Sequence, residues 1–84
     1  MNQQLIFNDD VCWNVERKQI ECSVIHGGMK IRCSISADYL APSAVSKTTA
    51  EWLALYDAQR FDIEDELQEM VEQEQFTEAG ELVL

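Results

Sequence analysis

Three cysteines and a single histidine are the side chains of this 84-residue chain that could bind zinc or act in nucleophilic catalysis. Cys12, Cys22, Cys33 and His26 are the residue types of a zinc site, but they show no C-x-x-C or H-x-x-x-H spacing. A nucleophilic cysteine or serine would need His26 beside it and a third group that orients the imidazole. His26 instead adjoins the glycine pair Gly27-Gly28. We therefore expect free thiols, no metal, no cofactor and no catalytic residue.

Carboxylates are abundant, but their placement does not favour acid–base catalysis. Sixteen Asp and Glu residues stand against six Lys and Arg residues, for a formal net charge of −10, and residues 61–84 hold nine of these acids and no base. Pairs such as Glu66 and Glu69 belong to a predicted exposed helix face, where nothing drives two pKa values apart. No glycine-rich phosphate loop is present either. The sequence therefore predicts a protein that is not an enzyme.

Charge and hydropathy also argue against several binding classes. A net charge of −10 repels nucleic-acid phosphates, and Lys30 and Arg32 lack the aromatic platform of an RNA-binding sheet. No apolar run approaches the roughly eighteen residues of a membrane span. The first four residues have neither the basic nor the apolar region of an export signal. We expect a cytoplasmic protein with reduced thiols, no direct binding of nucleic acid and no membrane association.

The first half of the chain has the alternation of β-strands. Between Gln19 and Ser36 apolar and polar residues alternate on both sides of Gly27-Gly28, a pair typical of a two-residue hairpin turn. Closing the turn there predicts apolar pairs on the core face: Val24 with Ile31, Cys22 with Cys33, and Ile20 with Ile35, with Met29 on the same side. Residues 11–15 extend the meander and pair Trp13 with Ile20, and Leu5-Ile6-Phe7 would add a short fourth strand.

The opposite face of this predicted meander is mostly polar, as in an antiparallel sheet with one solvated side. Ile25, Lys30 and Arg32 lie on it, and we take them as part of a candidate interaction surface. Their neighbours on the same face are Glu21, Ser23 and Ser34.

The acidic half has the pattern of helices that cover the core face. Thr48-Thr49-Ala50-Glu51 matches a capping box, which predicts a helix start near Thr48. One long helix or two would fit the pattern, and we favour two because Asp62 is a suitable N-cap. Arg60 and Glu64 are spaced for an ion pair, and Glu66 and Glu69 join the candidate interaction surface. The apolar stripe consists of Trp52, Leu53, Tyr56, Ile63, Leu67, Met70 and Val71.

These patterns predict a single α+β domain over residues 1–84, with two layers. An antiparallel meander of three or four strands (about 5–36) leads through a connector (37–47) to two acidic helices (48–75) packed on one face. Residues 76–84 form a tail or a short edge strand.

The chain resembles a known family of bacterial proteins over nearly its whole length. The resemblance rests on Gly28-Met29, Cys33, Ile35-Ser36, Leu40, Glu51-Trp52-Leu53, Arg60 and Asp62-Ile63-Glu64. It is similar to the family catalogued as domain of unknown function 1488, whose members are also short and acidic in the second half. The resemblance implies a bacterial cytoplasmic α+β domain, brings no activity or catalytic residue with it, and implies core positions for its apolar residues, Met29 and Leu40 included.

The function most consistent with these features is a small non-catalytic protein–protein interaction or regulatory module. The alternative is an acidic module that competes for a basic, nucleic-acid-binding surface of a partner protein. We also expect a homodimer, because the second sheet face, the sheet edges and the apolar terminus Leu82-Val83-Leu84 are left over after the core is assigned.

Overall fold

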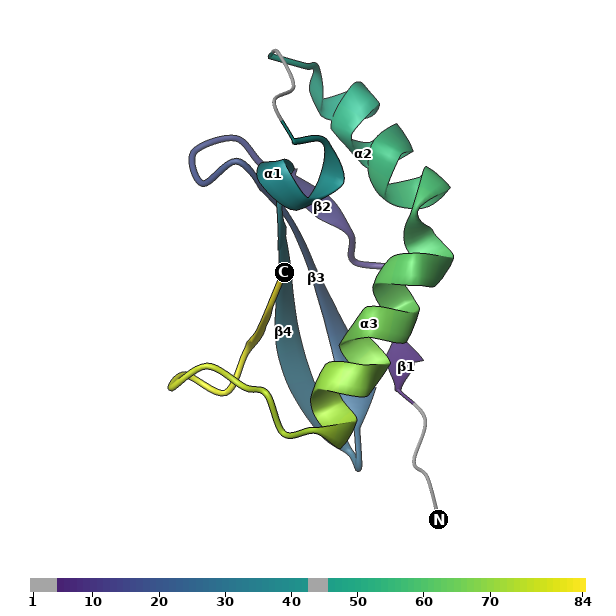
Figure 1. The fold of residues 1–84 in the computed structure, drawn as a ribbon, viewed down its shortest axis with the longest axis vertical. Coiled ribbons are helices and arrows are strands. Elements are labelled where there is room, and N and C mark those ends of the chain that lie inside the picture. The colour runs from purple at the N-terminus through teal and green to yellow at the C-terminus, as the bar shows by residue number, and fades with distance from the viewer. Residues whose placement is uncertain (1–4, 43–45) are drawn as a thin grey trace.

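The chain folds as one sheet with its helices on one side, in the computed structural model that describes residues 5–42 and 46–84 (Figure 1). Residues 1–4, which enter the expectation about export, and residues 43–45 of the predicted connector lie outside the described residues. The elements are β1 (Ile6–Phe7), β2 (Cys12–Asn14), β3 (Gln19–His26), β4 (Met29–Ser36), α1 (Ala37–Leu40), α2 (Thr49–Ala58), α3 (Arg60–Glu72) and β5 (Leu82–Val83). The α+β class and the two helices are thereby confirmed.

The central hairpin has the predicted register. β3 and β4 pair antiparallel, with Val24 opposite Ile31 and Cys22 opposite Cys33. The two turn residues, Gly27 and Gly28, have φ of 57° and 80°. A type I′ turn needs both of its central residues in this left-handed region, which explains why a glycine pair closes the hairpin.

The sheet differs from the predicted meander at its first edge. β1 and β2 both pair antiparallel with β3, one after the other, so they share one edge. Phe7 lies opposite Val24 and Cys12 lies opposite Glu21, so residues 8–11 face only Cys22 and Ser23 of β3. Residues 8–11 therefore form a bulge with two extra residues, which keeps the same side chains on each face.

The sheet also gains a fifth strand at the other edge. β5 pairs with β4 in parallel, with Cys33 opposite Leu82, so the sheet is mixed rather than purely antiparallel. The Leu84 amide donates to the Ser34 carbonyl at 2.8 Å, and the Ser36 amide donates to the Leu84 carbonyl at 2.9 Å. Leu82 is fully buried. Leu82 therefore belongs to the core of its own chain and is not left for a partner, whereas Val83 beside it stays 48% exposed.

The helical layer lies on the core face of the sheet (Figure 1). α2 begins at the predicted capping box: the Thr48 hydroxyl accepts from the Glu51 amide, and the Glu51 carboxylate accepts from the Thr48 amide. α3 begins two residues before the predicted cap Asp62, with Gln59 at its N-cap and no side-chain cap. The Gln59 side chain instead donates to the Leu40 carbonyl at 2.8 Å, which ties α1 to the junction of α2 and α3. No helix in the described part of the chain is long and apolar enough to cross a bilayer.

The core is the predicted one with two additions, Leu5 and Leu82, and one correction. Leu40 and Val71 are buried as expected, while Leu53, Met70 and Trp13 are only partly buried. Met29, placed in the core by its alternation, is 70% exposed because it is the first residue after the turn, at the end of the sheet. The remaining buried apolar residues are Ile20, Cys22, Val24, Ile31, Cys33, Ile35, Trp52, Tyr56, Ile63 and Leu67.

Candidate functional site

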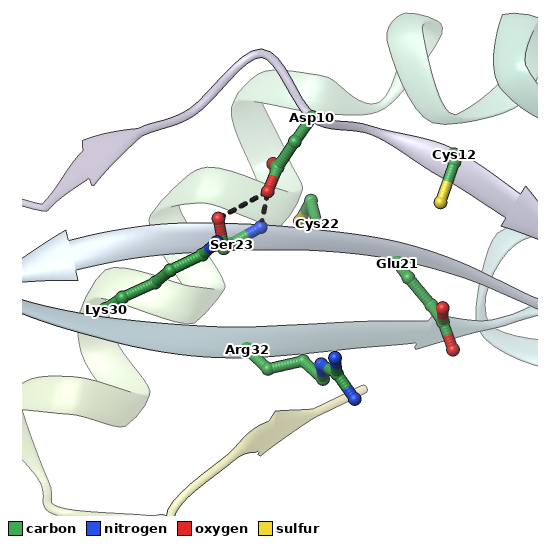
Figure 2. A pocket seen from close by; sticks show the side chains of 7 residues that line it. All are labelled: Asp10, Cys12, Glu21, Cys22, Ser23, Lys30 and Arg32. Carbon is green, nitrogen blue, oxygen red and sulfur yellow. Dashed lines mark hydrogen bonds between the residues drawn. The ribbon is translucent and has the colours of Figure 1, made fainter.

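The side of the sheet that faces away from α2 and α3, which we call the open face, carries a shallow cleft of about 380 Å³. Figure 2 shows its lining residues on the bulge, β2, β3 and β4. They include two carboxylates and two cations, and the set is Asp10, Cys12, Glu21, Cys22, Ser23, Lys30 and Arg32. The strand alternation that buries Val24 and Ile31 places Ser23, Lys30 and Arg32 on this side.

Asp10 is held in place by hydrogen bonds from the bulge to β3 (Figure 2). The Ser23 amide donates to Asp10 Oδ1 at 3.0 Å, and the Ser23 hydroxyl donates to Asp10 Oδ2. The Asn8 side chain donates to the Ser23 hydroxyl at 2.9 Å. The hydrogen bond from the Ser23 hydroxyl lowers the pKa of Asp10. The Asp10 carboxylate thus accepts the backbone hydrogen bond that Ser23 of β3 would otherwise give to a neighbouring strand, and it stays ionised.

Glu21 is the second hydrogen-bonded carboxylate of the open face. Its Oε2 accepts from the Gln19 side chain at 2.7 Å and from the Asn14 side chain at 3.1 Å. These bonds, the one from Gln19 first, lower the pKa of Glu21. Asp10 and Glu21 are therefore shifted in the same direction, whereas an acid–base pair needs one pKa raised and one kept low. These two carboxylates therefore do not form the pair with opposed pKa shifts that acid–base catalysis uses.

Lys30 and Arg32 supply the positive charge of the open face. Both side chains are exposed, and within residues 5–42 and 46–84 neither has a carboxylate at ion-pair distance. Ile25 lies opposite Lys30 and is half-buried, and its other neighbour Ile6 is 61% exposed. The face thus combines unpaired cations, fixed carboxylates and a small apolar end.

A second surface, on the outside of α3, carries only negative charge around one aromatic ring. Phe61 is 83% exposed, and Asp65 and Glu69 follow it at four-residue spacing on the same side of the helix. We call Phe61, Asp65 and Glu69 the acidic strip. At the start of α3, Arg60 Nε donates to Glu64 Oε2 at 2.8 Å, the spacing expected of this pair.

The structure separates the residues that the sequence grouped as one candidate surface. Lys30, Arg32 and Ile25 lie together on the open face, whereas the exposed Glu66 and Glu69 lie on α3, on the other side of the sheet. Sequence reasoning missed Asp10 and Phe61. The Asn8-Asp9-Asp10 cluster did indicate an irregular segment, but an exposed phenylalanine has no signature in the sequence that distinguishes it from a core residue.

A second cleft of about 350 Å³ lies on the helical side, between the β2–β3 turn, α1 and the start of α2. Trp13 stacks on Trp52 at its floor, with ring centroids 4.7 Å apart and planes 11° apart. Lys18 and Asp38 bring opposite charges to its rim. The Glu51 carboxylate already occupies the first turn of α2, so this helix start does not offer an anion site.

The cysteines are divided between the two sides of the sheet. Cys12 is exposed on the open face, whereas Cys22 and Cys33 are buried opposite each other in β3 and β4. The sulfur contact lowers the pKa of Cys22 and, together with burial, raises the pKa of Cys33. Among the described residues no three His, Cys, Asp or Glu side chains come together in a cluster that could hold a metal ion.

This division predicts two classes of thiol. In the folded, dilute protein a disulfide reagent should modify only Cys12 rapidly, because Cys22 is 6% exposed and Cys33 is fully buried. In denaturant all three thiols should react. A spectrophotometric thiol titration with and without urea counts the reactive thiols in the denatured and the folded protein. Metal analysis of the same sample measures any bound zinc. One reactive thiol in urea, or stoichiometric zinc, would contradict the prediction.

Comparison with known proteins yields relatives whose function is not established. The model of the family "Protein of unknown function (DUF1488)" matches residues 5–84. The chain is 29% identical over 80 residues to "Uncharacterized protein YrdB" of Escherichia coli K12 and equally to that of Shigella flexneri, with 95% of this chain and 94% of each relative covered. It is also similar to the crystal structure of a DUF1488 protein from Shewanella loihica PV-4, with a TM-score of 0.86 and 31% identity, over 100% of this chain and 94% of the other.

Proposed function

The chain belongs to the DUF1488 family of proteins of unknown function, and we propose that it acts as a non-catalytic protein–protein interaction module. Its acidic strip would bind a partner with a basic surface and an apolar notch. The observation that carries this proposal is Phe61, which is 83% exposed on a helix whose other exposed residues, after Arg60 at its start, are acids. A large exposed aromatic ring costs solvation free energy unless a partner covers it.

The charge of this half of the chain also favours a partner with a basic surface. Residues 61–84 carry nine carboxylates and no base, so their field attracts positively charged surfaces and repels acidic ones. Aromatic residues at the centre of an interface commonly contribute most of its free energy, with charges at the rim speeding association. Phe61 would then be the anchor, with Asp65 and Glu69 as the rim.

A second candidate function is competition for a nucleic-acid-binding surface of the partner. The feature that favours it is the single-sign charge of residues 61–84, because a run of carboxylates can occupy the sites that bind phosphates. The two candidates differ in one measurable respect. Under the second, added DNA or RNA displaces the chain from its partner, and under the first it does not.

The proposal predicts that capture of a partner depends on the acidic strip. Phe61→Ala, or Asp65→Asn with Glu69→Gln, should weaken binding of any partner that the wild-type chain retains from native cytosol by about tenfold or more. Affinity capture with quantitative mass spectrometry, followed by binding isotherms with the purified partner at several salt concentrations, measures the effect.

Val15→Ala and Glu16→Gln are matched controls, because they remove an exposed apolar side chain and an exposed acid at the distant β2–β3 turn. They should retain the partner. Equal retention by the strip variants, or equal loss with the control variants, would refute the acidic strip as the binding site.

A further inference from the structure

We propose that the open face is the interface of a homodimer whose two-fold axis runs parallel to β3 and β4. The open face lies on the side of the sheet away from the acidic strip, so this dimer does not depend on binding by the acidic strip. It starts from the four charged side chains of the open face, Asp10, Glu21, Lys30 and Arg32, whose formal charges cancel. On a chain of net charge −10, a neutral face is the one on which two copies repel each other least.

The charges are sorted by strand. Asp10 belongs to the bulge beside β3 and Glu21 to β3, whereas Lys30 and Arg32 both belong to β4 (Figure 2). Asp10 binds Ser23, and Ser23 lies opposite Arg32, so Asp10 and Arg32 stand at the same level along the strands. The open face therefore has an acidic side and a basic side.

Two copies can stack open face to open face about a two-fold axis that runs either along the strands or across them. Only the axis along the strands brings opposite charges together. An axis parallel to the strands, between β3 and β4, places the acidic side of one copy over the basic side of the other. Asp10 then faces Arg32 of the second copy, and Glu21 lies within reach of the same guanidinium. An axis perpendicular to the strands would place β4 on β4, which brings cations together. Sheets stacked face to face with nearly aligned strands are a common packing.

The charged groups needed for this interface are accessible to a second copy. Lys30 and Arg32 are exposed and have no ion-pair partner within residues 5–42 and 46–84. Asp10 and Glu21 are held by Ser23 and Gln19 in fixed positions, which reduces the entropy lost on binding. Both copies of α3 would lie on the outside, so the acidic layers stay apart.

The size of the face indicates a dimer that dissociates on dilution. The eight-residue strands β3 and β4 are about 26 Å long, and a sheet four strands wide spans about 19 Å, so the open face covers at most roughly 500 Å² in projection. Such an area lies at the lower end of specific interfaces. Light scattering coupled to size exclusion should therefore show a mass that rises with concentration, over the micromolar range, from 9.6 kDa towards twice that value.

Charge reversal tests the face and its symmetry. Arg32→Glu should weaken the dimer by about tenfold or more, because it places acid opposite acid. Adding Glu21→Lys should restore part of the affinity, since it brings a cation within reach of the substituted position 32 of the second copy, while Asp10 still repels it. Asp65→Lys, a reversal on the acidic strip, should leave the dimer at least as stable. Circular dichroism verifies the fold of each variant.

A measurement on the unaltered protein keeps the test independent of variant folding. Cys12 lies on the open face, so its modification by a thiol reagent should slow as the dimer forms, in proportion to the dimeric fraction. A constant mass of 9.6 kDa at all concentrations would overturn the homodimer. A dimer in which Arg32→Glu has no effect, or in which Cys12 stays equally reactive, would overturn the open face as its interface.

Discussion

Truncation of Trp52 to alanine is expected to lower the free energy of unfolding by about 3–5 kcal/mol. The ring is 6% exposed, stands on α2 in the core and stacks on Trp13. Removing it leaves a cavity under the helical layer and exposes the face of Trp13. Small domains have a total stability of about 5–15 kcal/mol, so the loss is a large part of the whole. Urea denaturation followed by circular dichroism measures it, at fixed protein concentration because dimerisation would shift the midpoint.

Phe61→Ala is the matched control for Trp52→Ala. It also removes a large aromatic side chain from a helix, but Phe61 is 83% exposed, so the change should alter stability by less than about 1 kcal/mol. Similar denaturation midpoints for the wild type and Trp52→Ala would show that α2 does not pack on the sheet. The comparison also establishes that Phe61→Ala is folded, which the partner-capture experiment requires.

The parts of the fold that the sequence predicts well are those specified by neighbouring residues. The register of β3 with β4 follows from Gly27-Gly28 and from the alternation on either side, because a slip by one residue would bury Lys30 or Arg32. The start of α2 follows from Thr48 and Glu51, whose side chains satisfy the first amides of the helix. Both signals act within a few residues of the feature that they specify.

The features that escaped prediction depend on contacts between distant segments. β5 pairs in parallel with β4 across some fifty residues, and a two-residue strand has no alternation from which such pairing can be deduced. The register shift at the bulge depends on Asp10 binding Ser23, an interaction that no spacing rule describes. Met29 obeys its alternation but lies at the end of the sheet, so parity alone misplaces it.

The candidate site was predictable in part from the sequence. Strand parity places Ile25, Lys30 and Arg32 on one face, and helix periodicity places Glu66 and Glu69 on an exposed side of α3. Because the helices were also expected to cover the core face, the predicted fold already places these two groups on opposite sides of the sheet, although one candidate surface was assigned to both. The packing of α2 and α3 on the side of Val24 and Ile31 separates them.

Leu82→Ala is the other substitution with a large expected effect, about 2–5 kcal/mol of destabilisation. The side chain is fully buried although it is the third residue from the end of the sequence, and its strand β5 covers the edge of β4. Its truncation leaves a cavity beside Cys33 and weakens the contact between β5 and the core. Because chain ends usually fray, a large loss at this position would be direct evidence that the terminus is part of the core. Thermal and urea denaturation, monitored by circular dichroism, measure it.

Val83→Ala separates the effect of side-chain burial on stability from the effect of strand formation. Val83 belongs to the same two-residue strand, pairs with Ser34 and is 48% exposed, so its truncation should cost less than about 1 kcal/mol. Valine has a high β-propensity, so Val83→Ala loses at least as much of it as Leu82→Ala, and any larger loss for Leu82→Ala therefore reports its buried contacts. Equal and small losses for the two variants would show that β5 is frayed in solution. The edge of β4 would then be free to pair with a second chain, and the open face would no longer be the favoured surface for dimerisation.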